Sequence, residues 1–233
     1  MTRSPFVRPT PLTRAAALAV LLIVGLSASF LIWRYPDLPD LLPVHFRRNG
    51  YPNGWQFKTW TRAMMPVFVQ VALAVTLGAV ATLLLVRPGG DDPEAPDVRA
   101  AAFAAEAIAL IALIWVAFQG YVALALTGMW SSGRAGLGPY ASVEIGGLVL
   151  TVGVAVRAHL KLGRPAPRPF VAAHWWLGQL YRNPDDPALF VPTRDGSHWT
   201  LNFGRPVAAG LLAALLGLGI LGPTVILALL LRW

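Results

Sequence analysis

Five long apolar runs divide this sequence, and they limit what the chain can fold into more than any other feature. A helix rises about 1.5 Å per residue, so about 20 apolar residues cross a hydrocarbon core roughly 30 Å thick. We therefore predict an all-α integral membrane protein with about five transmembrane helices. The runs are Ala15–Trp33, Met64–Val86, Ala100–Leu126, Tyr140–Val156 and Val207–Leu231.

The composition agrees with this class. Hydrophobic residues make up 56% of the chain and charged residues only 13%, whereas a soluble domain carries roughly 25% charged residues. The chain has no cysteine, which excludes disulfides, thiolate chemistry and Cys-ligated metals. The net charge of +8 fits basic residues that lie among anionic headgroups, and we expect no nucleic-acid partner.

Two apolar runs leave the layout open. Tyr140–Val156 is the shortest run and carries Glu144 near its start. If it does not span, the chain has four helices and an outside N-terminus. We favour five spans, because Ile145–Val156 has no charged residue and is costly to leave in water. Three arginines, a short apolar core and residues 27–29 are typical of a signal peptide, but the apolar run continues to Trp33, which favours a retained helix.

The basic residues orient the spans. With five spans and a cytosolic N-terminus, most of the 19 Lys and Arg residues lie inside, as the positive-inside rule requires. The four-span alternative also gives an inside excess. Five spans place the two long loops on opposite faces of the membrane, and four spans place both loops on one face.

The runs and loops define the predicted domains. Residues 1–86 form a helical pair around a structured loop at 34–62. Residues 87–156 hold helices three and four, 157–173 form a basic Pro-rich linker, 174–204 form a small aromatic-rich cytosolic cap, and 205–233 form the last helix. Residues 87–99 are expected to be a flexible connector.

Local signals predict some structure in both loops. Asn-Gly dipeptides at 49–50 and 53–54 favour tight turns and one short hairpin in the first loop. In the second loop we predict an interfacial amphipathic helix over His174–Tyr181. Short strands are expected at Ala188–Pro192 and His198–Phe203, with a turn between them.

The first loop carries Leu-Pro, Pro-x-His-Phe and Gly-Trp elements. This pattern resembles the loop after the first helix in the membrane family of unknown function that includes the SdpI-type toxin-immunity proteins. The resemblance implies a bacterial plasma-membrane protein whose loop faces outward and, in the immunity branch, protection from a secreted peptide toxin with signalling to a cytosolic repressor. Family members usually carry Asp where this chain has Asn53. The matched positions are Leu38, Pro39, Pro43, His45, Phe46, Gly50, Gly54, Trp55 and Lys58; all but the first two are our candidate ligand-binding residues.

The segment 174–204 resembles a second uncharacterised bacterial membrane-associated domain. That resemblance implies a layout and brings no known activity with it. The matched positions are His174, Trp175, Gly178, Tyr181, Asn183, Pro184, Asp186, Pro187, Phe190, Val191, Pro192, Arg194, Gly196, Trp199, Thr200 and Asn202. The candidate cap residues among them are His174, Trp175, Tyr181, Asn183, Asp186, Arg194, Trp199 and Asn202.

Few side chains in this sequence suggest chemistry. His45 could respond to acidic pH outside the cell, because imidazole titrates near about pH 6.5, but we favour a structural hydrogen bond in the loop. The cluster of His174, His198, Asp185 and Asp186 lacks the spacing of a zinc site, so we predict no metal. No nucleophile elbow or phosphate loop is present, so we expect no cofactor and favour a non-enzymatic role.

Four polar residues lie within or near the edges of the apolar runs: Gln70, Glu106, Gln119 and Glu144. A charge at bilayer depth costs at least about 2.5 kcal/mol on insertion scales, so each carboxylate needs a partner, a water cavity or a proton. Helix packing or placement at the membrane interface is the favoured role. Glycines in the last run favour close contact with another helix or a second copy of the chain.

These features lead to a functional hypothesis. We predict a recognition, immunity or signalling protein whose first loop binds an extracytoplasmic peptide or lipid-like ligand. Its partners would be the bilayer, a secreted peptide, a cytosolic regulator and another copy of itself. A second hypothesis is a small transporter or channel with Glu106 and Glu144 lining a cavity. A third is a membrane enzyme that uses the His and Asp residues of 174–198.

Overall fold

The structure is a computed structural model that describes residues 7–47, 49–85, 96–134, 138–162, 169–186, 188–196 and 198–213. The chain divides into two compact units, which are described separately below. The bundle unit comprises Pro11–Gly78 and Glu106–Arg157. The terminal unit comprises Met1–Thr10, Ala79–Ala105 and Ala158–Trp233.

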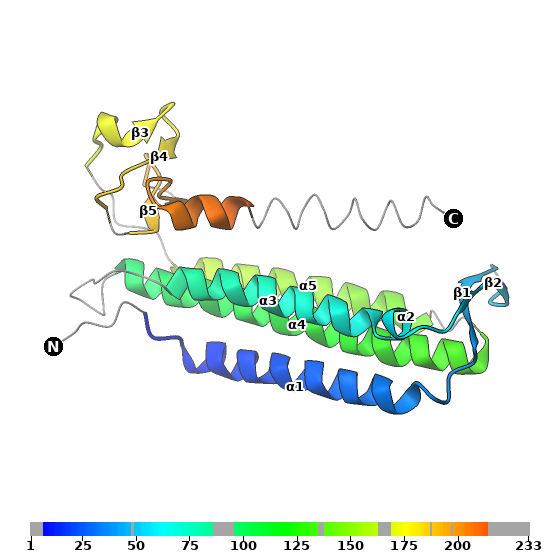
Figure 1. Cartoon of the computed structure of the whole chain (residues 1–233). Coiled ribbons are helices and arrows are strands. Elements are labelled where there is room, and N and C mark those ends of the chain that lie inside the picture. Colours follow the sequence, from blue (N-terminus) through cyan, green and yellow to red (C-terminus); the bar gives the residue numbers. More distant parts are fainter. Residues whose placement is uncertain are drawn as a thin grey trace. The chain divides into compact units, whose positions relative to one another are not determined.

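Four long helices dominate the described chain (Figure 1). Each is long and apolar enough to cross a membrane, which supports a multi-pass membrane protein. The short helix α2, Trp60–Ala63, and a two-stranded hairpin lie between the first and second of them. The four are α1 (Pro11–Arg34), α3 (Met65–Leu85), α4 (Pro96–Ser132) and α5 (Gly138–Leu162).

The helix boundaries settle part of the predicted layout. Helix α5 contains the whole run Tyr140–Val156 and extends beyond it at both ends, so its length is sufficient for a span. Helix α4 begins at Pro96, so the expectation that all of 87–99 is a connector is wrong at its end. Proline suits the first helical turn, where its missing N–H has no partner to lose. The fifth predicted span is helical over residues 206–213, and its remainder lies outside the described residues.

The bundle unit is held together by small and branched apolar side chains. Val20 of α1 packs with Ala112 and Val116 of α4. Closer to the far end of α1, Leu31 packs with Val67 and Ala123. Many outward-facing side chains of these helices are also apolar. In the most apolar 18 residues of α5, only 6% are buried within the protein. Apolar surface of this extent requires a lipid environment or a protein partner.

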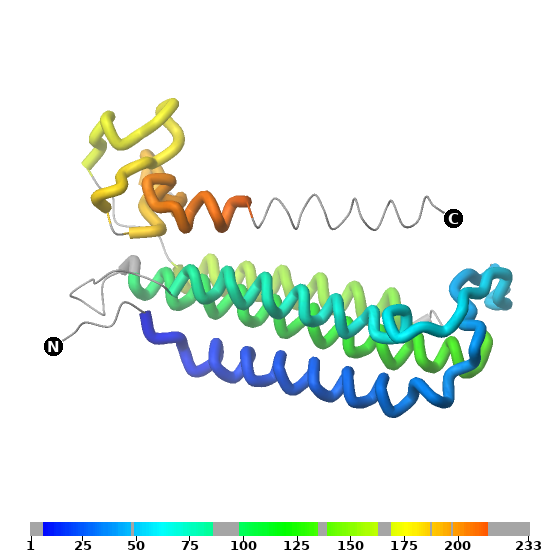
Figure 2. Tube along the Cα trace, in the orientation of Figure 1, coloured from blue at the N-terminus to red at the C-terminus, as the bar shows by residue number. Residues whose placement is uncertain are grey.

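The loop after α1 forms a two-stranded antiparallel hairpin, as predicted from its turn dipeptides. Strand β1 covers Leu41–Phe46 and β2 covers Pro52–Phe57, and Figure 2 traces the chain from α1 through this hairpin into α3. The turn places Gly50 at φ 81°, a left-handed conformation that glycine adopts without steric cost. At the base of the hairpin, Leu38 and Leu42 pack against Ala63 and Trp130 in a buried cluster.

The segment after α5 folds into a small β-rich module, which we define as residues 169–205. It contains the 3-10 helix η1 (Ala172–His174) and the strands β3 (Trp175–Trp176), β4 (Leu180–Tyr181), β5 (Phe190–Pro192) and β6 (Trp199–Leu201). Strands β3 and β4 form one hairpin, and β5 and β6 form another.

The two strands expected between residues 188 and 203 are therefore confirmed, but the amphipathic helix predicted over His174–Tyr181 is wrong. Trp175 pairs with Tyr181 across a hairpin, and both pack with Ala188 and Val191 in the core of the module. The turn between them places Leu177 and Gly178 at positive φ, which a helix cannot accommodate.

Candidate functional site

The tip of the first hairpin is organised by a hydrogen bond between His45 and Asn53. The His45 Nδ1 atom lies 2.5 Å from Asn53 Oδ1. A carbonyl oxygen only accepts hydrogen bonds, so Nδ1 carries the hydrogen, and in the neutral imidazole Nε2 is then an acceptor on an exposed side chain. His45 thus makes a structural hydrogen bond within the loop, and its partner is the side-chain amide of Asn53.

Gly54 is needed for this arrangement. His45 is the cross-strand neighbour of Gly54, next to an irregularity in the strand register. A Cβ atom built on Gly54 would lie 2.9 Å from His45 Cβ, closer than carbon atoms normally approach. The Gly-Trp element of the sequence therefore has a steric basis: its glycine makes room for the histidine.

One face of the hairpin presents apolar side chains to its surroundings. Leu41 lies opposite Phe57, and Pro43 lies opposite Trp55. Residues opposite each other, or two apart along one strand, share a face of the sheet. We call Leu41, Trp55 and Phe57 the hairpin face; their exposed fractions are 49%, 53% and 75%. His45 and Asn53 lie toward the tip of this face.

Lys58 is held by the base of the same hairpin. Its ammonium donates to the Leu38 carbonyl at 2.7 Å and lies 3.6 Å from the Asp40 carboxylate. It also lies 5.3 Å from the centroid of the Tyr35 ring. These contacts give Lys58 a role in fixing the hairpin to the end of α1, in addition to the predicted role in ligand binding.

The other predicted loop residues have mixed placements. Pro43 is buried, Phe46 and Gly50 are half-buried, and the exposed members are His45 and Trp55. Trp60, just after the hairpin, stacks on Tyr35 with ring centroids 3.8 Å apart. The structure thus brings the first-loop candidates into one hairpin, and only some of them are available to a ligand.

The polar residues of the bundle have separate environments. Gln70 is fully buried, and its Nε2 donates to Ser27 Oγ at 3.0 Å and to the Val116 carbonyl at 2.9 Å. One side chain on α3 therefore links α1 and α4. Gly120 lets the helices approach here, because an added Cβ would lie 3.3 Å from Ser27 Oγ.

The two carboxylates suggested for a transport path are not paired with each other. Glu106 is buried and forms an ion pair with Arg157, Nη1 to Oε1, at 2.5 Å. Glu144 is exposed on α5, and 13 residues separate it from Arg157, or roughly 20 Å along a helix. Arg157 could have been found as the partner of Glu106, because Glu106 lies in the first third of one apolar run and Arg157 directly follows the next, which places both at the same end of two antiparallel helices. Gln119 is half-buried.

In the terminal module, the motif residues serve the fold through Asn202. This side chain is fully buried. Its Oδ1 accepts from the backbone N–H of Asn183 at 3.0 Å and of Gly204 at 2.9 Å. Its Nδ2 donates to the carbonyls of Asn183, Asp186 and Ala188. Asn202 thereby ties β6 to the turn that contains the Asn-Pro-Asp-Asp-Pro sequence.

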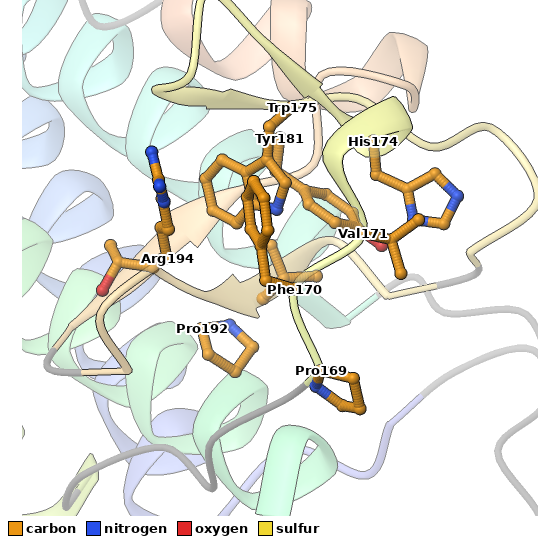
Figure 3. A pocket seen from close by; sticks show the side chains of 10 residues that line it. Pro169, Phe170, Val171, His174, Trp175, Tyr181, Pro192 and Arg194 are labelled. Atoms are coloured by element: carbon orange, nitrogen blue, oxygen red, sulfur yellow. The ribbon is translucent and has the colours of Figure 1, made fainter.

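The remaining cap residues complete that network or line a cavity. The Tyr181 hydroxyl donates to Asp186 Oδ2 at 3.1 Å. His174, Trp175 and Arg194 line a cavity of about 40 Å³ (Figure 3), which has room only for a few water molecules. Arg194 lies over the Phe170 ring at 4.6 Å, and Trp199 is half-buried. Within the described residues, no three His, Asp or Glu side chains converge as metal ligands.

The comparisons with known proteins bear on these same two loops. Residues 22–69 match the model of a domain of unknown function, DUF1648. Residues 184–208 match the model of a family of unknown function, DUF5808. Both resemblances noted in the sequence thus fall on uncharacterised families. No curated protein and no solved structure matches the chain.

Proposed function

We propose that this chain is a recognition protein of the bacterial plasma membrane whose β1–β2 hairpin binds a secreted peptide or a lipid-like molecule outside the cell. The observation that carries the proposal is the hairpin face. Leu41, Trp55 and Phe57 are exposed on a small sheet whose base is fixed in a buried cluster with Trp130 of α4. Rigid, exposed aromatic side chains are the usual anchors of binding surfaces.

The arrangement suits a ligand that is apolar with a polar group. Trp55 and Phe57 offer apolar area, and the exposed His45 offers an imidazole acceptor beside them. Asn53 already fixes the orientation of the His45 ring. A ligand that binds Nε2 would therefore not lose the conformational entropy of ordering that side chain. A membrane-active peptide and a single-chain lipid both combine these two properties.

The order of the helices supports opposite sides for the hairpin and the terminal module. If α1, α3, α4 and α5 all cross the membrane, the hairpin follows the first crossing and the module follows the fourth. With the N-terminus in the cytosol, the hairpin is then extracytoplasmic and the module cytosolic, where it could contact a regulator. Immunity and signalling, implied by the resemblance of the first loop, would use these two sides.

The sidedness can be tested directly because the chain has no cysteine. Thr61→Cys and Asp185→Cys, each as a single cysteine at an exposed position, are treated in intact cells with a maleimide that does not cross membranes. We expect modification of the Thr61 variant alone, and of the Asp185 variant only after the cells are opened. Modification of both variants in intact cells, or of the Asp185 variant alone, would refute the arrangement.

The binding role needs a separate test with defined probes. The full chain in nanodiscs is titrated with a panel of synthetic amphipathic peptides and a series of single-chain phospholipids. We expect at least one probe to bind, and Trp55→Ala to weaken it by about tenfold or more, as for a central aromatic anchor. Thr61→Ala, exposed on α2 just after the hairpin, is the matched control. Binding that Trp55→Ala leaves unchanged, or no binding by any probe, would count against the proposal.

Transport through the bundle has weaker support. Its two candidate carboxylates lie on different helices, Glu106 on α4 and Glu144 on α5, and Glu106 is already bound to Arg157. That ion pair provides the partner that a buried carboxylate needs in a membrane, so helix pairing is sufficient to account for it.

A further inference from the structure

The turn of the β3–β4 hairpin combines two features that are unfavourable for an isolated protein. Leu177 has φ 52°, a left-handed conformation that favours glycine or asparagine and disfavours a branched side chain. Its side chain is also 76% exposed. Neither the backbone geometry nor burial within the module accounts for leucine at this position.

Trp176, the preceding residue, is exposed for a geometric reason. Successive residues of a strand point to opposite faces. Trp175 points into the module, where it packs with Tyr181 and Val191. Trp176 therefore points away, and its exposed fraction is 60%. The tip of the hairpin thus presents a large aromatic and a large aliphatic side chain side by side.

We propose that this tip, Trp176 and Leu177, inserts into the headgroup region of the bilayer that the chain's own helices span. Tryptophan prefers this region because its ring is apolar and its N–H remains hydrogen-bonded, and leucine gains by leaving water. The loss of favourable backbone geometry at Leu177 is offset only when the side chain reaches an apolar phase.

The short connection between α5 and the module favours the bilayer as the binding partner of the hairpin tip. Helix α5 ends at Leu162, and six residues, 163–168, precede the described part of the module. Such a segment spans at most about 25 Å when fully extended. On the other side of the module, a new helix begins at Pro206, directly after the Asn202 network. The module thus follows the fourth membrane helix after a short segment and directly precedes the fifth predicted span.

Charge complementarity favours the same partner. Lys161 lies near the end of α5, and Arg164 and Arg168 follow it in the sequence. Basic residues next to a span are attracted to anionic lipids. They would hold the start of the module near the headgroups and bring the hairpin tip to its binding depth.

The absence of native cysteine allows a direct depth measurement. A nitroxide label is attached to Gln179→Cys, an exposed residue of the same turn that leaves both anchors in place, in the full chain reconstituted in liposomes. Asp185→Cys, exposed in another turn of the module, is the matched control. Collision rates with oxygen, which concentrates in lipid, and with a water-soluble nickel complex give the depth of each label.

We expect the oxygen-to-nickel ratio at position 179 to exceed that at position 185 severalfold. Equal ratios would show that the turn is in water and would overturn the proposal. Low collision rates with both reagents at position 179 would show that protein covers the turn, which would overturn it as well.

A second variant separates lipid contact from folding. Leu177→Asn suits the left-handed backbone and removes the apolar side chain. We expect it to lower the ratio at position 179 toward that at position 185, while hydrogen exchange of residues 181–204 stays as in the unsubstituted chain. An unchanged ratio would eliminate Leu177 as an anchor and contradict the proposal. Because none of these measurements involves the β1–β2 hairpin, failure here leaves the ligand-binding proposal intact.

Discussion

The two aromatic loops of this protein are stabilised in opposite ways. The β1–β2 hairpin is fixed by apolar packing of Leu38 and Leu42 on Trp130, and its polar groups interact at the surface. The terminal module has a small apolar core around Val191 and depends on a buried polar side chain, Asn202. In the module the conspicuous polar residues maintain the fold, whereas in the hairpin the conspicuous exposed residues remain available for binding.

The largest effect is expected at the centre of the module. Asn202→Ala removes five hydrogen bonds and leaves their backbone partners without the buried amide. Each unsatisfied buried group costs about 1–3 kcal/mol, and some will regain water, so we expect destabilisation by about 3–5 kcal/mol and unfolding of the module. Hydrogen exchange of residues 174–204 should become fast, while that of α4 stays slow.

Asp185→Ala serves as the control for that experiment. Its side chain is exposed in the same turn region. Its backbone N–H donates to Asn183 Oδ1, and the substitution keeps this hydrogen bond. Slow exchange in Asn202→Ala would mean that the apolar core alone maintains the module.

The next effect tests backbone crowding at Gly204. An added Cβ would lie 2.4 Å from the carbonyl carbon of Asn183 and 2.6 Å from Pro184 N. These are backbone atoms in a turn that Asn202 fixes, so they cannot move aside easily. We expect Gly204→Ala to destabilise the module by about 3 kcal/mol, measured by denaturant dependence of exchange in residues 181–204. Gly178→Ala is a useful comparison, because nothing lies within 4 Å of its Cβ position and its cost is limited to backbone strain at φ 70°.

A smaller effect is expected at the base of the first hairpin. Lys58→Met keeps most of the apolar stem but removes the hydrogen bond to the Leu38 carbonyl. The Asp40 side chain is almost fully exposed, so that ion pair contributes little. We expect a loss of about 1–2 kcal/mol, seen as faster exchange at residues 38–58. If Lys58→Met weakens ligand binding without changing exchange, its contribution is direct contact and not support of the hairpin.

Sequence patterns predicted the long helices and the first hairpin because their determinants are local. Apolar length predicts the spans, and the Asn-Gly dipeptide at 49–50 predicts the turn, whereas a turn at 53–54 is wrong because these two residues lie within β2. The β3–β4 hairpin was missed because Leu177 is not a residue that indicates positive φ, and the pairing of Trp175 with Tyr181 depends on the core beneath them. The function of Asn202 was equally hidden, because its partner Asn183 lies 19 residues away. The same holds for Gln70 and Ser27, which are 43 residues apart.

The smallest effect on stability is expected for Gly54→Ala, and it distinguishes the two loops clearly. It is the counterpart of Gly204→Ala, but the atom that the added Cβ meets belongs to a side chain and not to the backbone. At Gly54 an added Cβ would lie 2.9 Å from His45 Cβ, an atom fixed by its own backbone, so the two exposed strands must move apart slightly at this position. We expect Gly54→Ala to destabilise the hairpin by only about 1 kcal/mol, but to break the hydrogen bond between His45 and Asn53. The measurement is the His45 side-chain resonance by NMR, together with exchange of residues 41–57.

A double substitution shows whether the hydrogen bond between His45 and Asn53 contributes to the cost of Gly54→Ala. His45→Ala keeps the Cβ atom but removes the ring and its hydrogen bond to Asn53. In this background a local shift of the strands no longer breaks that hydrogen bond. Gly54→Ala should therefore cost less in the His45→Ala background than in the native chain, with a coupling of about 0.5 kcal/mol or more between these neighbours. Additive effects would mean that the cost comes from the contact with the Cβ atom, which both backgrounds share, and that the ring and its hydrogen bond to Asn53 do not add to it.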